Sequence, residues 1–249
     1  MTPQTKQPII GIMLDYEHNG SFSNRPYYAL RCAYFEAISN AGGIPVAIPY
    51  LKDSTKDFLE IIDGLLLPGG FYSFPTSFYN YDNNNDGTLH PRAQFESDFL
   101  NYALEQDIPV LGICAGMQLI AAISGALVER DVHSSRSMNI NHLNEKPAEE
   151  LAHKIYIRPK TLLHKITQCN EMSVNTAHQE GIDPHSADTI SNLIINSWAP
   201  DGVIEGIELS NKRFVLGVQW HPEFFANQES PHFSIFKALI TQAISNNEQ

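Results

Sequence analysis

Cysteine is scarce in this sequence: its 249 residues include only Cys32, Cys114 and Cys169. An odd number of cysteines at wide spacing does not make a disulfide framework. None of the three has a partner in a C-x-x-C pair, which argues against a cysteine zinc site. We therefore expect reduced thiols, as in proteins of the cytoplasm.

Positive charge is also scarce. The chain has 16 Lys and Arg residues against 28 Asp and Glu residues, a formal net charge of −12. Nucleic-acid binding needs Lys and Arg to displace counterions from phosphates, so this balance argues against a nucleic-acid partner. Apolar runs long enough to span a bilayer are missing, and the polar start, residues 1–8, has no signal-peptide pattern. These absences argue against a membrane protein and predict a cytoplasmic one.

The hydrophobic fraction, 43%, is that of an ordinary globular protein. In the first half of the chain, the hydrophobic residues form short apolar segments typical of strands, which alternate with amphipathic segments typical of helices. The pattern predicts strands at 8–14, 44–48, 64–67 and 108–113, and helices at 27–40, 56–62, 92–105 and 117–124. Such an alternation predicts a mainly parallel, doubly wound α/β sheet with helices on both faces.

The second half is richer in strands, which we predict at 153–157, 172–175, 190–197, 203–209 and 213–219, before a final helix at 230–245. Several of these strands form hairpins, so we expect an antiparallel extension of the parallel core. No repeat or linker divides the chain, which predicts one domain over 1–249. The polar, aromatic segment 71–90 predicts a long surface loop, which either shapes the leaving-group side of a site or forms an oligomer contact.

The strand at 108–113 meets the next helix through the run GICAG at 112–116. Glycines two residues on either side of a nucleophile permit a tight strand-to-helix turn that exposes the middle side chain at the carboxyl end of the sheet. A helix N-terminus favours a thiolate, and the Ala115 N–H would point at a developing oxyanion. Cys114 is the candidate nucleophile; the alternative is a buried structural cysteine. Cys32 is interpreted as a core residue on a helix face.

A candidate general base follows the last predicted strand, in His221-Pro222-Glu223. The strand delivers His221 to its end, and Pro222 stops the strand pairing. Glu223 can then turn back to orient the imidazole and stabilise its protonated form. By itself, the His-Pro-Glu motif is weak evidence for a catalytic base. Together with the Cys114 turn upstream, it is stronger evidence.

The other histidines give no metal-binding pattern, because the sequence has no H-x-H or H-E-x-x-H pair. We therefore predict no metal site, and a cysteine acyl-enzyme needs no cofactor. His133 and His153 are compatible with either a surface or a site position. We expect the histidines in polar stretches to be solvated: His18, His90, His142, His164, His185 and His232.

Three motifs in order, LLLPGG at 65–70, GICAGMQ at 112–118 and VQWHPE at 218–223, resemble those of class I glutamine amidotransferases. Further segments narrow the resemblance to the γ-glutamyl-γ-aminobutyrate hydrolase group of peptidase family C26: PIIGI, AGGIPVAIP, Arg92 with Glu96, VNTAHQ and APDGVIEGIE. The resemblance covers nearly the whole chain and implies a flavodoxin-like fold.

The resemblance also implies roles for individual residues. Cys114, His221 and Glu223 would form a catalytic triad, and backbone N–H groups of Gly70 and Ala115 would hold the oxyanion. Gly69 would let the backbone approach a ligand closely. Gln118 and the loop that carries His178 would line the γ-glutamyl pocket; for His178 the alternative is a loop residue with a local hydrogen bond.

The chain departs from the pattern of this group at several positions. Ala115 stands where Arg is common, Ala93 where Asp is common after Arg92, and Glu180 where Gln is common. Ser124-Gly125 replaces a double glycine. The backbone chemistry survives these changes because Ala115 keeps its N–H, so the departures bear on substrate preference.

Three functions remain open. The favoured one is a free-standing hydrolase of γ-glutamyl amides, because no synthetase domain accompanies the motifs. The second is a glutaminase subunit that passes ammonia to a separate synthetase. The third is a non-enzymatic binding module. The small-molecule substrate is the expected partner, with a homodimer or a synthetase complex as further options.

Overall fold

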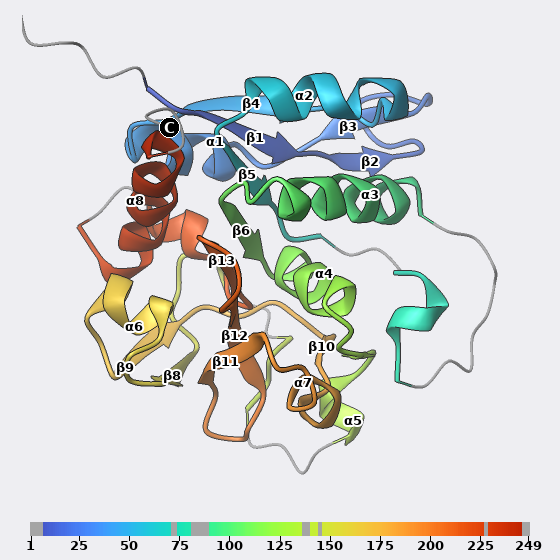
Figure 1. Ribbon diagram of the computed structural model, residues 1–249. Coiled ribbons are helices and arrows are strands. Elements are labelled where there is room, and N and C mark those ends of the chain that lie inside the picture. The colour runs from blue at the N-terminus through green and yellow to red at the C-terminus, as the bar shows by residue number, and fades with distance from the viewer. Residues whose placement is uncertain are drawn as a thin grey trace, which may run out of the picture.

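A nine-stranded sheet organises the chain in the computed structural model, which describes residues 7–70, 74–80, 90–135, 140–143, 146–226 and 229–245 (Figure 1). In spatial order the strands are β4 (Ile44–Ile48), β1 (Ile9–Met13), β5 (Gly64–Leu67), β6 (Val110–Ile113), β13 (Val215–Val218), β12 (Ile204–Leu209), β11 (Leu193–Trp198), β8 (His153–Ile157) and β9 (Glu171–Val174).

The sheet has a parallel half and an antiparallel half. Strands β4, β1, β5, β6 and β13 run parallel to their neighbours. From β13 onward, each neighbouring pair through β12, β11, β8 and β9 is antiparallel. This confirms the predicted doubly wound parallel core with an antiparallel extension.

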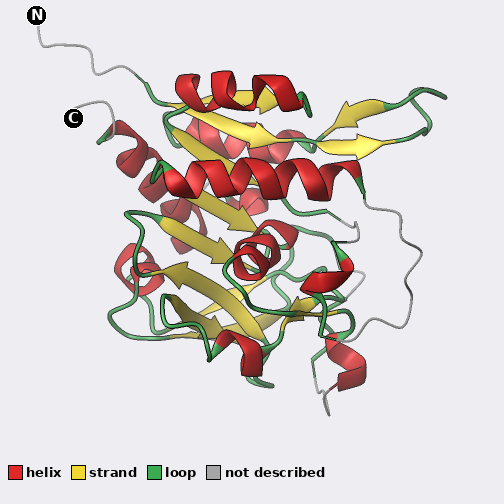
Figure 2. Ribbon diagram, turned by 45° about the vertical axis from the view of Figure 1, so that its right-hand side comes forward, coloured by secondary structure: helices red, strands yellow, loops and turns green. Residues whose placement is uncertain are grey.

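Helices cover both faces of the sheet (Figure 2). The helices are α1 (Cys32–Asn40), α2 (Thr55–Ile61), α3 (Pro91–Glu105), α4 (Ala115–Ile123), α5 (Val132–Ser135), α6 (Leu162–Thr167), α7 (Pro184–Ala187) and α8 (Pro231–Ile244). The buried core is divided by the sheet: α2, α3 and α4 pack on one face, and α1, α6 and α8 on the other.

Strand β5 shows how the sequence produces these two cores. Its side chains alternate between the faces, so that Leu65 and Leu67 join the core beneath α3 and α4, and Leu66 joins the core beneath α1 and α8. All three are fully buried. Each burial contributes roughly 2 kcal/mol. A strand buried on both faces reads as a continuous apolar run, which is why this strand was predictable.

The helix predicted over 27–40 begins only at Cys32, so that prediction was wrong for its first residues. Strand β3 (Tyr27–Ala29) instead pairs antiparallel with β2 (Asp15–Glu17). The Tyr28 ring packs edge-on against the ring of Tyr16, at 5.9 Å between centroids. Aromatic cross-strand pairs favour a strand, and they outweigh the apolar spacing that suggested a helix. Cys32 consequently lies exposed in the first helical turn rather than in the core.

The short elements of the second half were not predicted from the sequence. They are α5, α6, α7 and a small antiparallel sheet of β7 (Val128–Glu129) and β10 (Gly181–Ile182). Elements this short carry too few residues to show a hydrophobic period. No helix in the described part of the chain is long and apolar enough to cross a membrane. The single-domain organisation stays a prediction.

The segment predicted as a surface loop, 71–90, lies largely outside the described residues. Its described parts are 74–80 and residue 90, and the former contains the buried side chains of Phe74 and Tyr79. The Tyr79 hydroxyl hydrogen-bonds Glu180, and the Arg130 guanidinium lies 3.6 Å from the centre of the Tyr79 ring. These aromatics therefore anchor the segment to the protein.

We expect Gly116→Ala to destabilise the fold by about 2 kcal/mol or more. A methyl group at Gly116 would lie 2.7 Å from Cβ of Leu67 and would clash with the Leu67 carbonyl. The better helix propensity of alanine, about 1 kcal/mol, offsets only part of this cost. Urea unfolding measures the loss. Ser124→Ala, near the end of the same helix, is the control and should change stability by less than about 0.5 kcal/mol; equal stability of both variants would contradict the prediction.

Candidate active site

Cys114 occupies a strained turn between β6 and α4. Its φ of 52° and ψ of −108° place a non-glycine residue at positive φ, a conformation that costs of order 1–3 kcal/mol. The Cys114 N–H donates to the Val218 carbonyl at 2.8 Å, which extends the pairing between β6 and β13. The thiol is 5% exposed and lies at the carboxyl end of the parallel strands. The tight strand-to-helix turn is the one that the sequence predicted, and the role of Cys114 as a nucleophile stays a prediction.

His221 and Glu223 lie beside this turn, after the end of β13. The His221 Nδ1 atom is 2.8 Å from Glu223 Oε1, and both side chains are buried. Burial alone would lower the pKa of His221, but the Glu223 carboxylate and Cys114 outweigh it and raise that pKa to about 10. The imidazole therefore favours its protonated form, with Glu223 on one nitrogen and Cys114 as its other partner.

Asn175 holds the backbone of His221, and sequence reasoning did not single it out. Its side-chain oxygen accepts from the His221 N–H at 2.9 Å, and its amide nitrogen donates to the His221 carbonyl at 3.0 Å. This pair of hydrogen bonds joins the loop after β9 to the loop after β13. Asn175 belongs to the VNTAHQ motif, but only the histidine of that motif was assigned a role from the sequence.

The Pro68-Gly69-Gly70 turn after β5 closes the site from the other side. A Cβ atom on Gly69 would lie 2.7 Å from the His221 ring and 3.3 Å from Cys114 Cβ, so only glycine fits there. The Gly69 N–H donates to the Tyr34 hydroxyl at 3.0 Å. That N–H is consequently occupied, whereas Gly70 borders the neighbouring cleft.

Arg92 holds this turn in place through hydrogen bonds to its carbonyl groups. Its guanidinium donates to the carbonyls of Pro68 and Gly69, at 2.5 and 3.0 Å. It also pairs with Glu96 at 2.9 Å and with Asp15 at 3.4 Å. Arg92 and Glu96 are fully buried. A buried guanidinium with several acceptors fixes the turn in one position, because moving it would leave charges unpaired.

A cleft of about 530 Å³ opens above Cys114 and His221. Oppositely charged residues border it, Arg31 and Lys146 as well as Asp15 and Glu17. The remaining lining residues are Ala29, Leu30, Tyr34, Gly69, Gly70, Ala148, Asn175, Thr176, Ala177 and Phe224. The cleft thus combines the Cys114 thiol with charged side chains of both signs.

Gln118 does not border this cleft, although the resemblance implied that it would. Its amide nitrogen donates to the Glu180 carbonyl at 2.9 Å and to the Gln219 side-chain oxygen at 3.2 Å. The Gln219 amide in turn lies 3.5 Å from Cys114 Sγ. Gln118 is therefore connected to the thiol through Gln219, a residue that the sequence motifs contained but that was not singled out.

The His178 side chain also lies away from the cleft, while Thr176 and Ala177 of the same loop border it. The His178 ring is 2% exposed and faces His142. His142 and His232 were predicted to be solvated, and both predictions were wrong because both side chains are buried. His18 and His185 are exposed, as predicted.

Comparison with known proteins identifies the family. The family model described as Peptidase C26 matches residues 8–223. The chain belongs to the Peptidase C26 family. A glutamine amidotransferase-like protein of Rickettsia prowazekii is 34% identical, over 94% of this chain and 97% of the relative. The γ-glutamyl-γ-aminobutyrate hydrolase PuuD of Escherichia coli is 27% identical, over 94% and 92%.

Solved structures share the fold of this Peptidase C26 protein at low identity. The glutaminase domain of Trypanosoma brucei CTPS, solved with bound acivicin, aligns with a TM-score of 0.65 and 17% identity, over 94% of each chain. A Thermoplasma acidophilum protein described as belonging to GMP synthase gives a TM-score of 0.63 and 18% identity, over 98% of this chain and 97% of that one. Both likenesses confirm the class I glutamine amidotransferase fold.

We expect Arg92→Met to cost about 3–5 kcal/mol of stability, because it removes the guanidinium that pairs with the buried Glu96 carboxylate. The double variant Arg92→Met/Glu96→Leu should lose less stability than the single one, since it also removes the buried carboxylate that Arg92 pairs with. Chemical denaturation of both variants measures this coupling. Lys154→Met removes one partner of a solvent-exposed pair and should leave the stability close to that of the wild type. A double variant as unstable as Arg92→Met would contradict the role assigned to the buried pair.

Proposed function

We propose that this Peptidase C26 protein hydrolyses γ-glutamyl amides, with Cys114 as nucleophile, His221 as proton carrier and Glu223 as the group that orients it. The observation that carries the proposal is the strained Cys114 turn beside the 2.8 Å His221–Glu223 pair, at the base of a cleft. A thiol, an imidazole and a carboxylate in that order are the components of cysteine-dependent acyl transfer.

The proposed reaction has two halves. The thiolate of Cys114 attacks the γ-carbonyl carbon, and the resulting tetrahedral oxyanion accepts hydrogen bonds from backbone N–H groups of Gly70 and Ala115. The His221 imidazolium then donates its proton to the departing amine, and a γ-glutamyl thioester forms. Neutral His221 next removes a proton from water, which attacks the thioester and releases glutamate.

The raised pKa of His221 supports its role as the acid of the first half. An imidazole held protonated by Glu223 already carries the proton that the leaving amine needs. The Gln219 side-chain amide donates to Cys114 Sγ at 3.5 Å, which helps to fix the position of the sulfur. The Gly69 N–H is occupied by Tyr34, which leaves Gly70 as the donor expected from this turn.

The charged rim of the cleft suggests how a γ-glutamyl group is recognised. Such a group carries an α-carboxylate and an α-ammonium at the end remote from the scissile amide. Arg31 and Lys146 are suited to the carboxylate, and Asp15 and Glu17 to the ammonium. Similarity to PuuD, named as a γ-glutamyl-γ-aminobutyrate hydrolase, supports this substrate class. Gln118 and His178 then act through their neighbours rather than by contact with the substrate.

The protein should release glutamate from γ-glutamyl amines, and Cys114→Ala should lower the rate by roughly a thousandfold or more because no other group forms the thioester. A panel of γ-glutamyl amides, glutamine included, measures the rates and identifies the preferred leaving amine. Cys32→Ala and Cys169→Ala are matched controls and should keep full activity.

The same panel separates the competing functions. Turnover of glutamine alone, stimulated by a second protein, would favour a glutaminase subunit of a synthetase. Glutamate release that is equal in wild type and Cys114→Ala would rule out the cysteine mechanism, and no acylation of Cys114 by a γ-glutamyl electrophile would favour a binding module.

Glu223→Gln should lower kcat/KM by about 100-fold and move the alkaline limb of its pH profile to lower pH by one unit or more. The Glu223 carboxylate and Cys114 together raise the pKa of His221 to about 10, so removal of the carboxylate lets the imidazolium lose its proton at lower pH. Because the acid form of His221 is the active one toward the leaving amine, the rate should then fall earlier as pH rises. Rate measurements from pH 6 to 10.5 test this, and an unmoved alkaline limb would contradict it.

A further inference from the structure

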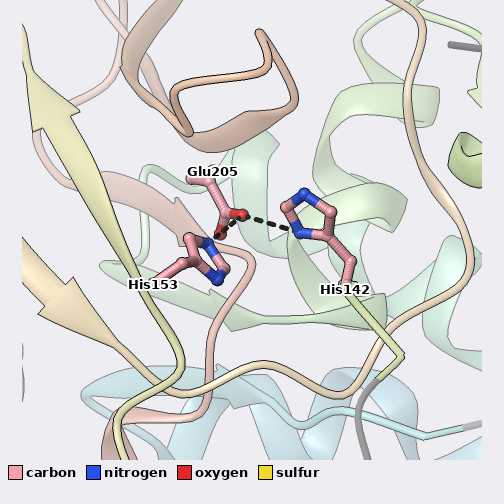
Figure 3. A group of neighbouring side chains, drawn as sticks. All are labelled: His142, His153 and Glu205. Carbon is pink, nitrogen blue, oxygen red and sulfur yellow. Dashed lines mark hydrogen bonds and ion pairs between the residues drawn. The ribbon is translucent and has the colours of Figure 1, made fainter. Parts of the chain in front are cut away.

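A second cluster of ionisable groups lies outside the proposed mechanism. His142, His153 on β8, His178 and Glu205 on β12 come from separate stretches of the chain and converge in the interior (Figure 3 shows three of them). Their side chains are at most 5% exposed. None of them borders the cleft above Cys114. Burial of each of these polar groups is unfavourable unless the group is paired. Four of them in one place therefore call for an interaction that compensates all four.

The inward-facing atoms are spaced like the ligands of one metal ion. His142 Nδ1 lies 3.3 Å from Glu205 Oε1, and His153 Nε2 lies 3.0 Å from the same oxygen. His178 Nε2 lies 3.1 Å from His142 Nδ1 and 3.8 Å from Glu205 Oε1. Tetrahedral bonds of about 2.0–2.1 Å to nitrogen and oxygen put neighbouring ligand atoms roughly 3.3 Å apart. These four separations bracket that value, and the ligand atoms of His142, His153 and Glu205 all lie within 4.8 Å of one another.

The outward-facing nitrogens of His142 and His178 have partners that fix their tautomers, whereas the outward-facing Nδ1 of His153 is buried without a hydrogen-bond partner among the described residues. His142 Nε2 lies 3.1 Å from the Asp201 carboxylate, and His178 Nδ1 lies 2.9 Å from the Glu180 carbonyl. Both partners are acceptors, so these nitrogens carry the hydrogens. The inner atoms, His142 Nδ1 and His178 Nε2, then face each other with lone pairs at 3.1 Å. Two opposed lone pairs at this distance repel each other, and either a metal ion or an added proton between them removes the repulsion.

This pattern is typical of histidines that bind metals, because a carboxylate or carbonyl on the remote nitrogen orients the ring and raises its basicity. Glu205 Oε2 points to the same conclusion, since it is buried without a hydrogen-bond partner among the described residues. Because Oε2 has no other partner in the described part of the chain, the Glu205 carboxylate can bind a cation through one oxygen or through both.

We propose that His142, His153, His178 and Glu205 form a structural site for one divalent transition-metal ion of the zinc class. Three imidazoles with one carboxylate suit zinc, whereas calcium and magnesium prefer all-oxygen sites. The absence of an H-x-H or H-E-x-x-H motif led us to predict no metal site. That prediction considered only local spacing, and these ligands come from distant segments.

A proton is the competing occupant of the cluster. Burial lowers the pKa of His142, but hydrogen bonds to Glu205 and Asp201 outweigh it and raise that pKa. A protonated His142 would place a hydrogen where the metal is proposed. The two occupants differ in what they need: a proton comes from water at any metal concentration, whereas a metal site is sensitive to chelators.

The site would brace the loop that borders the cleft. Residues Asn175, Thr176 and Ala177 line the cleft and directly precede His178. The Glu180 carbonyl accepts from both His178 and Gln118. A metal at the cluster would therefore stabilise the fold and fix this loop, without contact with the thiol.

The test is metal uptake by the full chain after dialysis against a chelator. We expect zinc to bind at one equivalent per chain, measured by competition with a chromophoric chelator. Cobalt in its place should give the intense visible absorption bands of a tetrahedral site. Zinc at 100 times its Kd should raise Tm by about 5–10 °C, as expected for a ligand that binds only the folded chain. Binding should persist in Cys114→Ala, which excludes a zinc ion held by the catalytic thiol.

Matched variants locate the site. His153→Gln and Glu205→Gln should weaken zinc binding at least 100-fold, while His185→Gln, which changes an exposed histidine, should bind like wild type. If His153→Gln and Glu205→Gln fail to fold, the zinc stoichiometry and the cobalt spectrum of the wild type still test whether the protein binds a metal ion. No uptake of zinc or cobalt by the wild type, with an unchanged Tm, would overturn the proposal and assign the cluster to a shared proton. Undiminished binding by both folded variants would overturn it as well.

Discussion

The backbone of Cys114 is held at positive φ, and the arrangement around the cleft depends on this constraint. A cysteine gains nothing locally from that conformation, which costs of order 1–3 kcal/mol. Its neighbours maintain it: the Cys114 N–H bonds to Val218, and Gly116 packs directly against the backbone of Leu67. The strain is thus balanced by the pairing of β6 with β5 and β13, which also places the thiol between the loops that follow those strands.

Buried charges around the thiol appear in combinations that satisfy one another. Arg92 is surrounded by Glu96, Asp15 and two carbonyls, and it fixes the turn at 68–70. His221 is paired with Glu223, and Asn175 holds its backbone. Because an unpaired buried charge is expensive, each group restricts the position of its partners. The candidate triad is therefore part of a rigid polar layer at the carboxyl edge of the parallel strands.

Amide side chains connect this layer to the histidine cluster. Gln219 lies next to Cys114 Sγ, and Gln118 joins Gln219 to the Glu180 carbonyl. The same carbonyl accepts from His178, which belongs to the cluster around Glu205. The two polar regions thus share one backbone group, although only the region around Cys114 borders the cleft.

The sequence by itself determined the parts of this protein that depend on neighbouring residues. The GICAG run specifies the strained turn, the apolar strands specify the parallel core, and His221-Pro222-Glu223 specifies the imidazole–carboxylate pair. Each of these features involves residues that are close together in the sequence, so that the local backbone geometry is enough to determine it. Tertiary structure alone decided that Tyr27–Ala29 forms a strand, that His142 is buried, that Gln219 connects Gln118 to the thiol, and that Arg31 and Asp15 share a cleft. Those outcomes depend on contacts between residues far apart in the chain, and such contacts are set by the order of strands in the sheet, which local periodicity does not encode.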